Sequence, residues 1–255
     1  TDAVSTPESR YENIGVIVDG EYRQLNANRL QIENEYYSTI RPKPPGSSRR
    51  TTAGLREHGV EYVEVRTLDI SPADPVGMNQ AQLRFLEVLL LYCLLSDSPA
   101  ITADEQREIA RRDLLAAREG RRPGLELPFG GGVQSIAEHA NAIASPLLEL
   151  AALLDESDDS YEQSVRCALE VCADPQRTPS AQLIDELRES RASFVEYSLD
   201  IARAHRSYFL EIPMESAVQA RFEQLAAESL AAAAELEAQR GESFAAYLEK
   251  FRRMV

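Results

Sequence analysis

An acidic and a basic residue in the middle of a predicted strand are the first candidates for chemistry. The segment from Val60 to Ile70 is rich in Val, Tyr and Thr, which favours a strand. Successive strand side chains point to opposite faces, so Glu64 and Arg66 share a face and lie about 7 Å apart. Such charges are costly to bury unless they are paired or hold a ligand or a metal. The pattern leaves two interpretations open, an edge strand with a cross-strand ion pair or a reaction site.

A second predicted strand, residues 31–41, carries a similar mixture. The same alternation places two acids, a tyrosine, a threonine and an arginine on one face: Glu33, Glu35, Tyr37, Thr39 and Arg41. This face is either solvated or the floor of a site. Carboxylate oxygens suit magnesium and arginine suits phosphate. Together they would suit phosphoryl transfer, where catalysis depends mainly on positioning and charge neutralisation.

Other residue types give weaker signals. The run Gly130–Gly132 lacks the Lys and Ser/Thr of a phosphate-binding loop, so we interpret it as a flexible turn. The three histidines are scattered without ligand spacing. The three cysteines lie in apolar helical contexts, which predicts buried free thiols and a reducing compartment. The residues concerned are His58, His139 and His205, with Cys93, Cys167 and Cys172.

The elements that would position these residues fall into two groups. Asp19-Gly20 between apolar runs predicts a hairpin, and it is followed by strands at 30–40 and 60–70. Pro44–Thr52 is expected to be a mobile basic loop, and residues 55–58 a short helical piece. From residue 79 the apolar period becomes helical, and residues 123–133 are expected to be a loop. The predicted helices span about 79–96, 102–119, 134–154, 159–173, 179–191, 192–208, 214–239 and 243–253. Thr102 and Glu105 predict a capping box at the start of the second of them.

This order predicts an α+β fold, with amino-terminal antiparallel strands that form part of a larger sheet, followed by a mostly helical region. We divide the chain into a strand-rich part, residues 1–78, and a helical region, residues 79–255, of the same domain.

Composition excludes some classes of function. The chain of 255 residues has a net charge of -15 and no basic stripe for a nucleic-acid backbone. The most apolar run, residues 83–95, is shorter than the roughly 20 residues that span a bilayer. No signal peptide is evident in the first twenty residues. We therefore expect a cytoplasmic protein that binds neither nucleic acid nor membrane.

Two strings of residues resemble the proteobacterial type of glutamate–cysteine ligase (γ-glutamylcysteine synthetase). They are LQIENEYYSTIRPK at residues 30–43 and GVEYVEVRTLDI at residues 59–70. Shorter stretches at residues 24–26, 82–86 and 120–125 support the resemblance, which extends over about residues 20–130. The later helices agree with the family in kind and only weakly in sequence.

The resemblance implies an ATP- and magnesium-dependent reaction, the first step of glutathione biosynthesis. ATP phosphorylates the γ-carboxylate of L-glutamate, and the amine of L-cysteine attacks the acyl phosphate. Glu64 matches the family's magnesium ligand, and Arg66 matches the catalytic arginine that neutralises the transferring phosphate. Tyr37 matches the tyrosine that lines the cysteine pocket, and Arg41 lies in the matching Ile-Arg-Pro segment, which assigns it to substrate binding.

The chain departs from the family in its length. Enzymes of this type are about twice as long, and their amino-terminal half supplies other metal-binding carboxylates and much of the glutamate site. The sequence is therefore interpreted as a carboxy-terminal fragment whose partner is the missing amino-terminal half, and the fragment alone is expected to be inactive. Two alternatives remain: a non-catalytic helical interaction module, or another carboxylate–amine ligase or guanido kinase of related fold.

Overall fold

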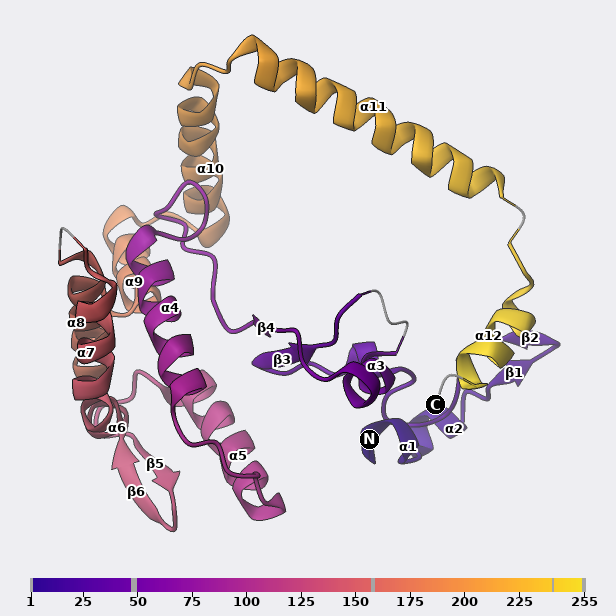
Figure 1. The fold of residues 1–255 in the computed structure, drawn as a ribbon, viewed down its shortest axis with the longest axis horizontal. Helices are drawn as coiled ribbons and strands as arrows, with labels where there is room; N and C mark the ends of the chain where they lie inside the picture. The colour runs from indigo at the N-terminus through magenta and orange to yellow at the C-terminus, as the bar shows by residue number, and fades with distance from the viewer. Residues whose placement is uncertain (1, 47–49, 157–158, 240, 254–255) are drawn as a thin grey trace. The chain divides into compact units, whose positions relative to one another are not determined.

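The computed structural model describes residues 2–46, 50–156, 159–239 and 241–253 (Figure 1). The chain divides into two compact units. One unit combines residues 1–69 with residues 214–255, and the other is the continuous segment 70–213. The first unit therefore joins the two ends of the chain. The predicted division at residue 78 had placed the carboxyl end with the helical region instead.

The amino-terminal part of the first unit begins with two short helices and a small hairpin. Helices α1 (Asp2–Ser5) and α2 (Ser9–Glu12) precede strands β1 (Ile17–Val18) and β2 (Glu21–Tyr22). The strands pair antiparallel, and the turn residues Asp19 and Gly20 have φ of 54° and 84°. Both turn residues therefore adopt the positive φ that a two-residue hairpin turn of this kind requires. The predicted hairpin is confirmed.

The predicted strand at 30–40 is wrong over most of its length. Residues Glu33–Glu35 form a 3₁₀ turn, η1, and only β3 (Ile40–Lys43) is extended and paired. The cause is a tertiary contact, because the Glu33 carboxylate binds Arg50 and Thr52, far along the sequence. Period-two alternation therefore does not govern residues 33–35.

A helix separates the two strands of the next pair. Helix α3 (Thr51–His58) ends at Gly59, whose φ is 77°, and β4 (Tyr62–Val65) follows as the central part of the predicted strand 60–70. Of the loop predicted at residues 44–52, residues 47–49 lie outside the described residues. Strands β3 and β4 pair antiparallel over four residue pairs.

The carboxyl end completes the first unit. Helix α11 (Ser216–Ala238) has no buried residue, and helix α12 (Phe244–Arg253) follows it. On α12, Leu248 is only 2% exposed, and the Phe244 ring meets the Tyr22 ring edge-on at 5.2 Å between centroids. Helix α12 therefore packs against the amino-terminal part of the same unit.

The second unit has a helical core. Helices α4 (Gln80–Leu95), α7 (Ala144–Leu154) and α8 (Ser160–Ala173) lie side by side in Figure 1 and contact one another. They bury Val88, Leu147, Ala151 and Val165 to 1% exposure or less. Their apolar faces follow the predicted helical periodicity.

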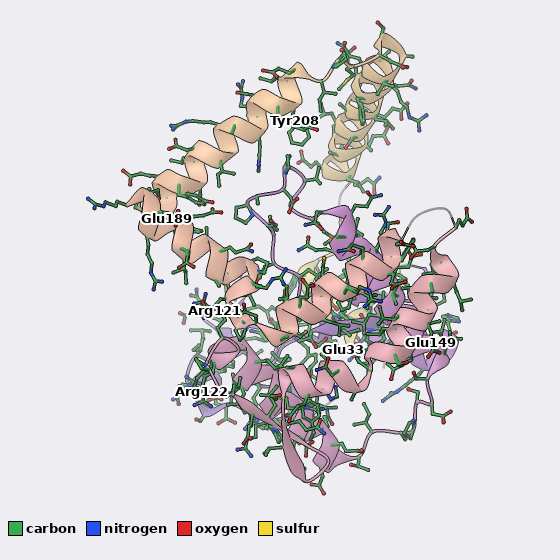
Figure 2. All side chains as sticks on the ribbon, turned by 90° about the vertical axis from the view of Figure 1, so that its left-hand side faces the viewer. Glu33, Arg121, Arg122, Glu149, Glu189 and Tyr208 are labelled. Atoms are coloured by element: carbon green, nitrogen blue, oxygen red, sulfur yellow. The ribbon has the colours of Figure 1, made fainter. Side chains whose placement is uncertain are left out.

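The second unit also contains further helices: α5 (Ala103–Glu119), α6 (Ile136–Ala142), η2 (Pro175–Arg177), α9 (Pro179–Ser190) and α10 (Phe194–Glu211). Thr102 and Glu105 form the predicted capping box at the start of α5. On α10, Tyr208 is 53% exposed (Figure 2).

The loop predicted at residues 123–133 is wrong. Residues 126–135 form a hairpin of β5 (Glu126–Phe129) and β6 (Gly132–Ser135), with Gly130 and Gly131 at φ of 55° and 85° in its turn. Both glycines adopt a backbone conformation that other residues resist. The run of glycines is thus a defined turn.

The prediction of an α+β fold is confirmed. The described strands form three separate antiparallel pairs, and the remaining elements are helices. No helix among the described residues combines the length and the apolar character needed to cross a membrane.

Candidate functional site

The β3–β4 pair brings together the two segments that the sequence singled out. Arg41 lies directly opposite Glu64 in the register, and Lys43 lies opposite Tyr62. Directly opposite residues of an antiparallel pair project from the same face. Because side chains alternate along each strand, Arg66 shares this face with Glu64, and Lys43 shares it with Arg41. We call the face that carries Arg41, Lys43, Glu64 and Arg66 the charged face.

Glu64 lies between two cations on the charged face. Its Oε1 is 3.1 Å from Lys43 Nζ, and its Oε2 is 3.9 Å from Arg66 Nε. The three side chains are between 26% and 33% exposed, so they are partly desolvated and neutralise one another. Glu64 therefore forms a cross-strand ion pair, as one of the two interpretations of the sequence required. An ion pair in the free protein does not exclude the other interpretation, since a ligand can exchange with either cation.

Tyr37 reaches the charged face through its contact with Arg66. The Arg66 Cζ lies 4.7 Å from the centroid of the Tyr37 ring, a cation–π geometry. The Arg66 amide also donates to the Thr39 carbonyl at 2.8 Å, which extends the pairing one residue beyond β4. The Tyr37 side chain remains accessible, with the residue 73% exposed. An exposed ring beside a guanidinium is free to contact a ligand.

Arg41 is tied to the turn η1. Its Nη2 donates to the Glu33 carbonyl oxygen at 3.3 Å. Burial works to raise the pKa of the Glu33 carboxyl, but hydrogen bonds from Thr52 and Arg50 outweigh it and hold the pKa below its usual range. Glu33 is therefore ionised in the folded protein at neutral pH, and it is bound within the protein rather than projecting from a strand face as predicted.

Lys43 is a candidate that the sequence reasoning missed. Its Nζ lies nearer to the Glu64 carboxylate than Arg66 Nε does. In the sequence, Lys43 is only the last residue of the motif at residues 30–43. The signal was available, because alternation from Arg41 places Lys43 on the same face of the strand. With Arg41 and Arg66, it gives the charged face three cations around one carboxylate.

The charged face does not form a metal site by itself. Among the described residues, no group of three or more His, Cys, Asp or Glu side chains could hold a metal ion. Magnesium takes six oxygen ligands. Several of them are usually water, and the protein usually supplies one or two carboxylates. Glu64 supplies one carboxylate beside two cations. An excess of positive charge of this kind is instead suited to an anion such as a phosphate or a carboxylate.

Known proteins that match this chain in sequence and in structure are glutamate–cysteine ligases. Residues 1–114 match the family model described as glutamate-cysteine ligase. The glutamate–cysteine ligase of Pseudomonas paraeruginosa is 41% identical over 99% of this chain and 48% of its own length. That of Shewanella oneidensis is 39% identical over 92% of this chain and 45% of its own length.

The similarity extends to structure. A crystal structure of the glutamate–cysteine ligase of Francisella tularensis in complex with AMP has a TM-score of 0.87 and 30% sequence identity. The match covers 99% of this chain and 50% of that one. The chain thus spans about half the length of the relatives it matches. The resemblance drawn from the two strand motifs is confirmed, whereas the individual roles of Glu64, Arg66, Tyr37 and Arg41 stay predictions.

Proposed function

Because this chain matches glutamate–cysteine ligases in sequence and fold over nearly all of its length, we propose that it is the carboxy-terminal half of such an enzyme. In this proposal ATP phosphorylates the γ-carboxylate of L-glutamate. The amine of L-cysteine then attacks the acyl carbon, the new amide bond forms, and phosphate leaves. The observation that carries the proposal is the charged face, where Glu64 lies between Lys43 and Arg66 within the matching motifs.

Each residue of the charged face has a proposed task. Arg66 neutralises the charge that develops on the transferring phosphoryl group, because a guanidinium presents paired donors to phosphate oxygens. Lys43 supplies a second positive charge beside it. Tyr37, held against Arg66, offers an exposed ring to the cysteine substrate. Arg41 binds a substrate carboxylate.

The nucleotide and the metal belong to the same proposal. The Francisella tularensis relative is in complex with AMP, which supports nucleotide use by this chain. We propose that Glu64 supplies one oxygen ligand to magnesium. The other protein ligands would come from the rest of the longer protein, because the described residues hold no complete set.

The missing amino-terminal half is the proposed partner. The apolar side chains opposite the charged face are open, with Ile40 at 51% and Val63 at 44% exposure. On α11, Phe222 is 60% and Leu225 is 47% exposed. Large apolar side chains are normally covered in a stable protein when they form continuous surfaces. The exposure is consistent with a chain that is one part of a cytoplasmic enzyme.

The proposal is tested by measuring product formation by the complete protein and by the 255-residue chain alone. The complete protein, incubated with ATP, magnesium, glutamate and cysteine, should release γ-glutamylcysteine and phosphate in equal amounts, as measured by mass spectrometry and a phosphate assay. The 255-residue chain alone should release neither, since its described residues hold no complete set of metal ligands. Product from the short chain would contradict the requirement for a second half.

A pair of matched variants of the complete protein links the activity to the charged face. Glu64→Gln should abolish product, because a neutral amide is a poor magnesium ligand. Glu61→Gln removes the same charge from the other face of the same strand segment, where Glu61 is exposed. This control should stay active, and equal loss in both variants would show that the charged face has no special role.

A further inference from the structure

The Glu33 carboxylate is the most fully bonded acid near the candidate site. Oε1 accepts from Arg50 Nη2 at 2.9 Å and from the Thr52 hydroxyl, while Oε2 accepts from the Thr52 amide at 2.9 Å. The Glu33 side chain is 14% exposed and that of Arg50 is 20% exposed. With these acceptor positions used inside the protein, Glu33 is poorly placed to bind a ligand, and its contribution must be structural or indirect.

The position of Thr52 explains why an acid is placed here. Thr52 belongs to the first turn of α3, whose cap residue Arg50 makes no side-chain capping bond. The first amides of a helix need an acceptor and favour negative charge. The Glu33 carboxylate supplies both from 19 residues away in sequence. It therefore joins η1 to the start of α3.

Helix α12 lies on the other side of the same ion pair. The Arg50 Cζ lies 5.4 Å from the centroid of the Phe251 ring. Leu248 and Phe251 border a cavity of about 180 Å³ together with Glu33 and Arg50. The last helix of the chain thus covers the guanidinium that holds Glu33 (Figure 2 marks Glu33).

The backbone of the same residue reaches the charged face. While the Glu33 carboxylate is fixed by Arg50 and Thr52, the Glu33 carbonyl accepts from Arg41 Nη2 at 3.3 Å. Arg41 is directly opposite Glu64. One residue therefore connects α3 and the α12-covered Arg50 to a cation of the candidate site.

We propose that Glu33 is a positioning residue that holds Arg41 in place for substrate binding, by tying η1 to α3 and to the Arg50 that α12 covers. The inference rests on the proposed function, because Arg41 is a substrate-binding residue only within it. Helix α12 then takes part indirectly in building the site, through Phe251 and Arg50.

A double-mutant cycle on the complete protein tests whether Glu33 acts through Arg41. Glu33→Ala should lower kcat/KM by about tenfold to a hundredfold, mostly through the KM of one substrate, since a small misplacement of a binding group has effects of this size. Arg41→Ala should raise the KM of the same substrate. Adding Glu33→Ala to Arg41→Ala should then lower kcat/KM by less than about threefold more, because coupled residues are not additive. Losses that multiply in the double variant would overturn the proposal.

Two further variants separate positioning from unfolding. Glu33→Gln keeps an acceptor for Thr52 and loses the ion pair with Arg50, so its kcat/KM should lie between those of the unmodified protein and Glu33→Ala. Glu35→Gln removes a charge from the same turn, where the Glu35 carboxylate accepts from the backbone amides of Gln31 and Ile32. It should match the unmodified protein. A loss in Glu35→Gln as large as in Glu33→Gln would also count against the proposal.

A crystal structure of the complete Glu33→Ala protein gives a readout independent of activity. Arg41 Nη2 should no longer lie within hydrogen-bonding distance of the residue 33 carbonyl. If that contact persists, Glu33 does not position Arg41. If the unmodified protein makes no γ-glutamylcysteine, the proposed function fails, while this structure still decides the role of Glu33.

Discussion

The strand pairs β3–β4 and β5–β6 have the same antiparallel pairing but present different kinds of side chain. Each is antiparallel over four residue pairs. The β3–β4 pair carries a half-buried ion-pair network on its charged face, whereas β5–β6 turns Leu127, 5% exposed, and Phe129 toward apolar surroundings. Two strand pairs of equal length therefore differ in the side chains that they present, charged groups on β3–β4 and apolar groups on β5–β6.

The surroundings of β5–β6 support this contrast. Phe129 stacks on His139 at 4.1 Å between ring centroids, and the Arg112 Cζ lies 4.3 Å from the same ring. Phe129, His139 and Leu127 border an apolar cavity of about 330 Å³ between helices of the second unit. We therefore expect changes in β5–β6 to alter stability and changes in β3–β4 to alter catalysis.

The largest effect is expected for Leu127→Ala. Truncation of a buried Leu costs about 2–5 kcal/mol of unfolding free energy, and the cost rises with the cavity that remains. Leu127 already borders a cavity, so little relaxation can compensate. Urea unfolding of the complete protein should show the loss, and kcat per folded molecule should not change. A strongly reduced kcat with normal stability would contradict the view that β5–β6 serves stability rather than catalysis.

Arg66→Lys should give the next largest effect, on turnover. The variant keeps the charge but loses the planar pair of donors. Loss of one such donor typically lowers kcat by about a hundredfold or more and leaves KM largely unchanged, since the contact is made mainly in the transition state. Steady-state kinetics of the complete protein beside a thermal melt measures both. An intact kcat with a lowered melting temperature would make Arg66 a structural partner of Glu64.

Gly131→Ala should destabilise the β5–β6 hairpin moderately. Gly131 has a φ of 85°, and a residue with a Cβ in the left-handed region costs about 1–2 kcal/mol. Gly132→Ala is the matched control, because Gly132 does not have a positive φ and its added Cβ would meet only the Phe129 carbonyl oxygen at 3.6 Å. Denaturation curves should separate the two variants, and equal costs would mean that the turn conformation is not what Gly131 provides.

The smallest effect is a pH dependence at His139. Burial, and then the nearby Arg112, lower the pKa of His139 below its ordinary value near 6.5. The unfolded chain therefore binds the proton more readily, and stability is lost as the pH falls from about 7 through the folded pKa. Much of the His139 side chain is exposed to solvent, so this loss of stability should be small. His139→Phe keeps a ring against Phe129 and should remove this part of the pH dependence measured by urea unfolding.

The local sequence pattern was sufficient to predict features that depend on side-chain alternation or on helix capping. Glu64 and Arg66 share a face as alternation required, and Thr102 with Glu105 forms the predicted cap. The Gly130–Gly131 turn could also have been predicted, because two glycines between apolar pairs are a hairpin signal.

The sequence could not predict features that depend on distant partners. Glu33 leaves the expected strand because Arg50 and Thr52, 17 and 19 residues away, bind its carboxylate. The packing of Leu248 against the amino-terminal part likewise has no local signal. For the candidate site, the strand motifs identified Glu64, Arg66, Tyr37 and Arg41. Alternation also places Lys43 on their face, but its ion pair with Glu64 and the bonds of Glu33 to Arg50 and Thr52 depend on contacts across strands and turns.

The assembly of one unit from both ends of the chain sets an order for folding during synthesis. Residues 70–213 form a continuous unit that leaves the ribosome before α12, whereas the first unit lacks Leu248 and Phe251 until the segment beyond residue 213 has been made. At about 5–20 residues per second, its strands wait several seconds after residue 213 for the closing helix. During that interval Phe251 does not yet cover Arg50, the guanidinium that holds Glu33, so α12 determines when, as well as how, the support of Arg41 becomes complete.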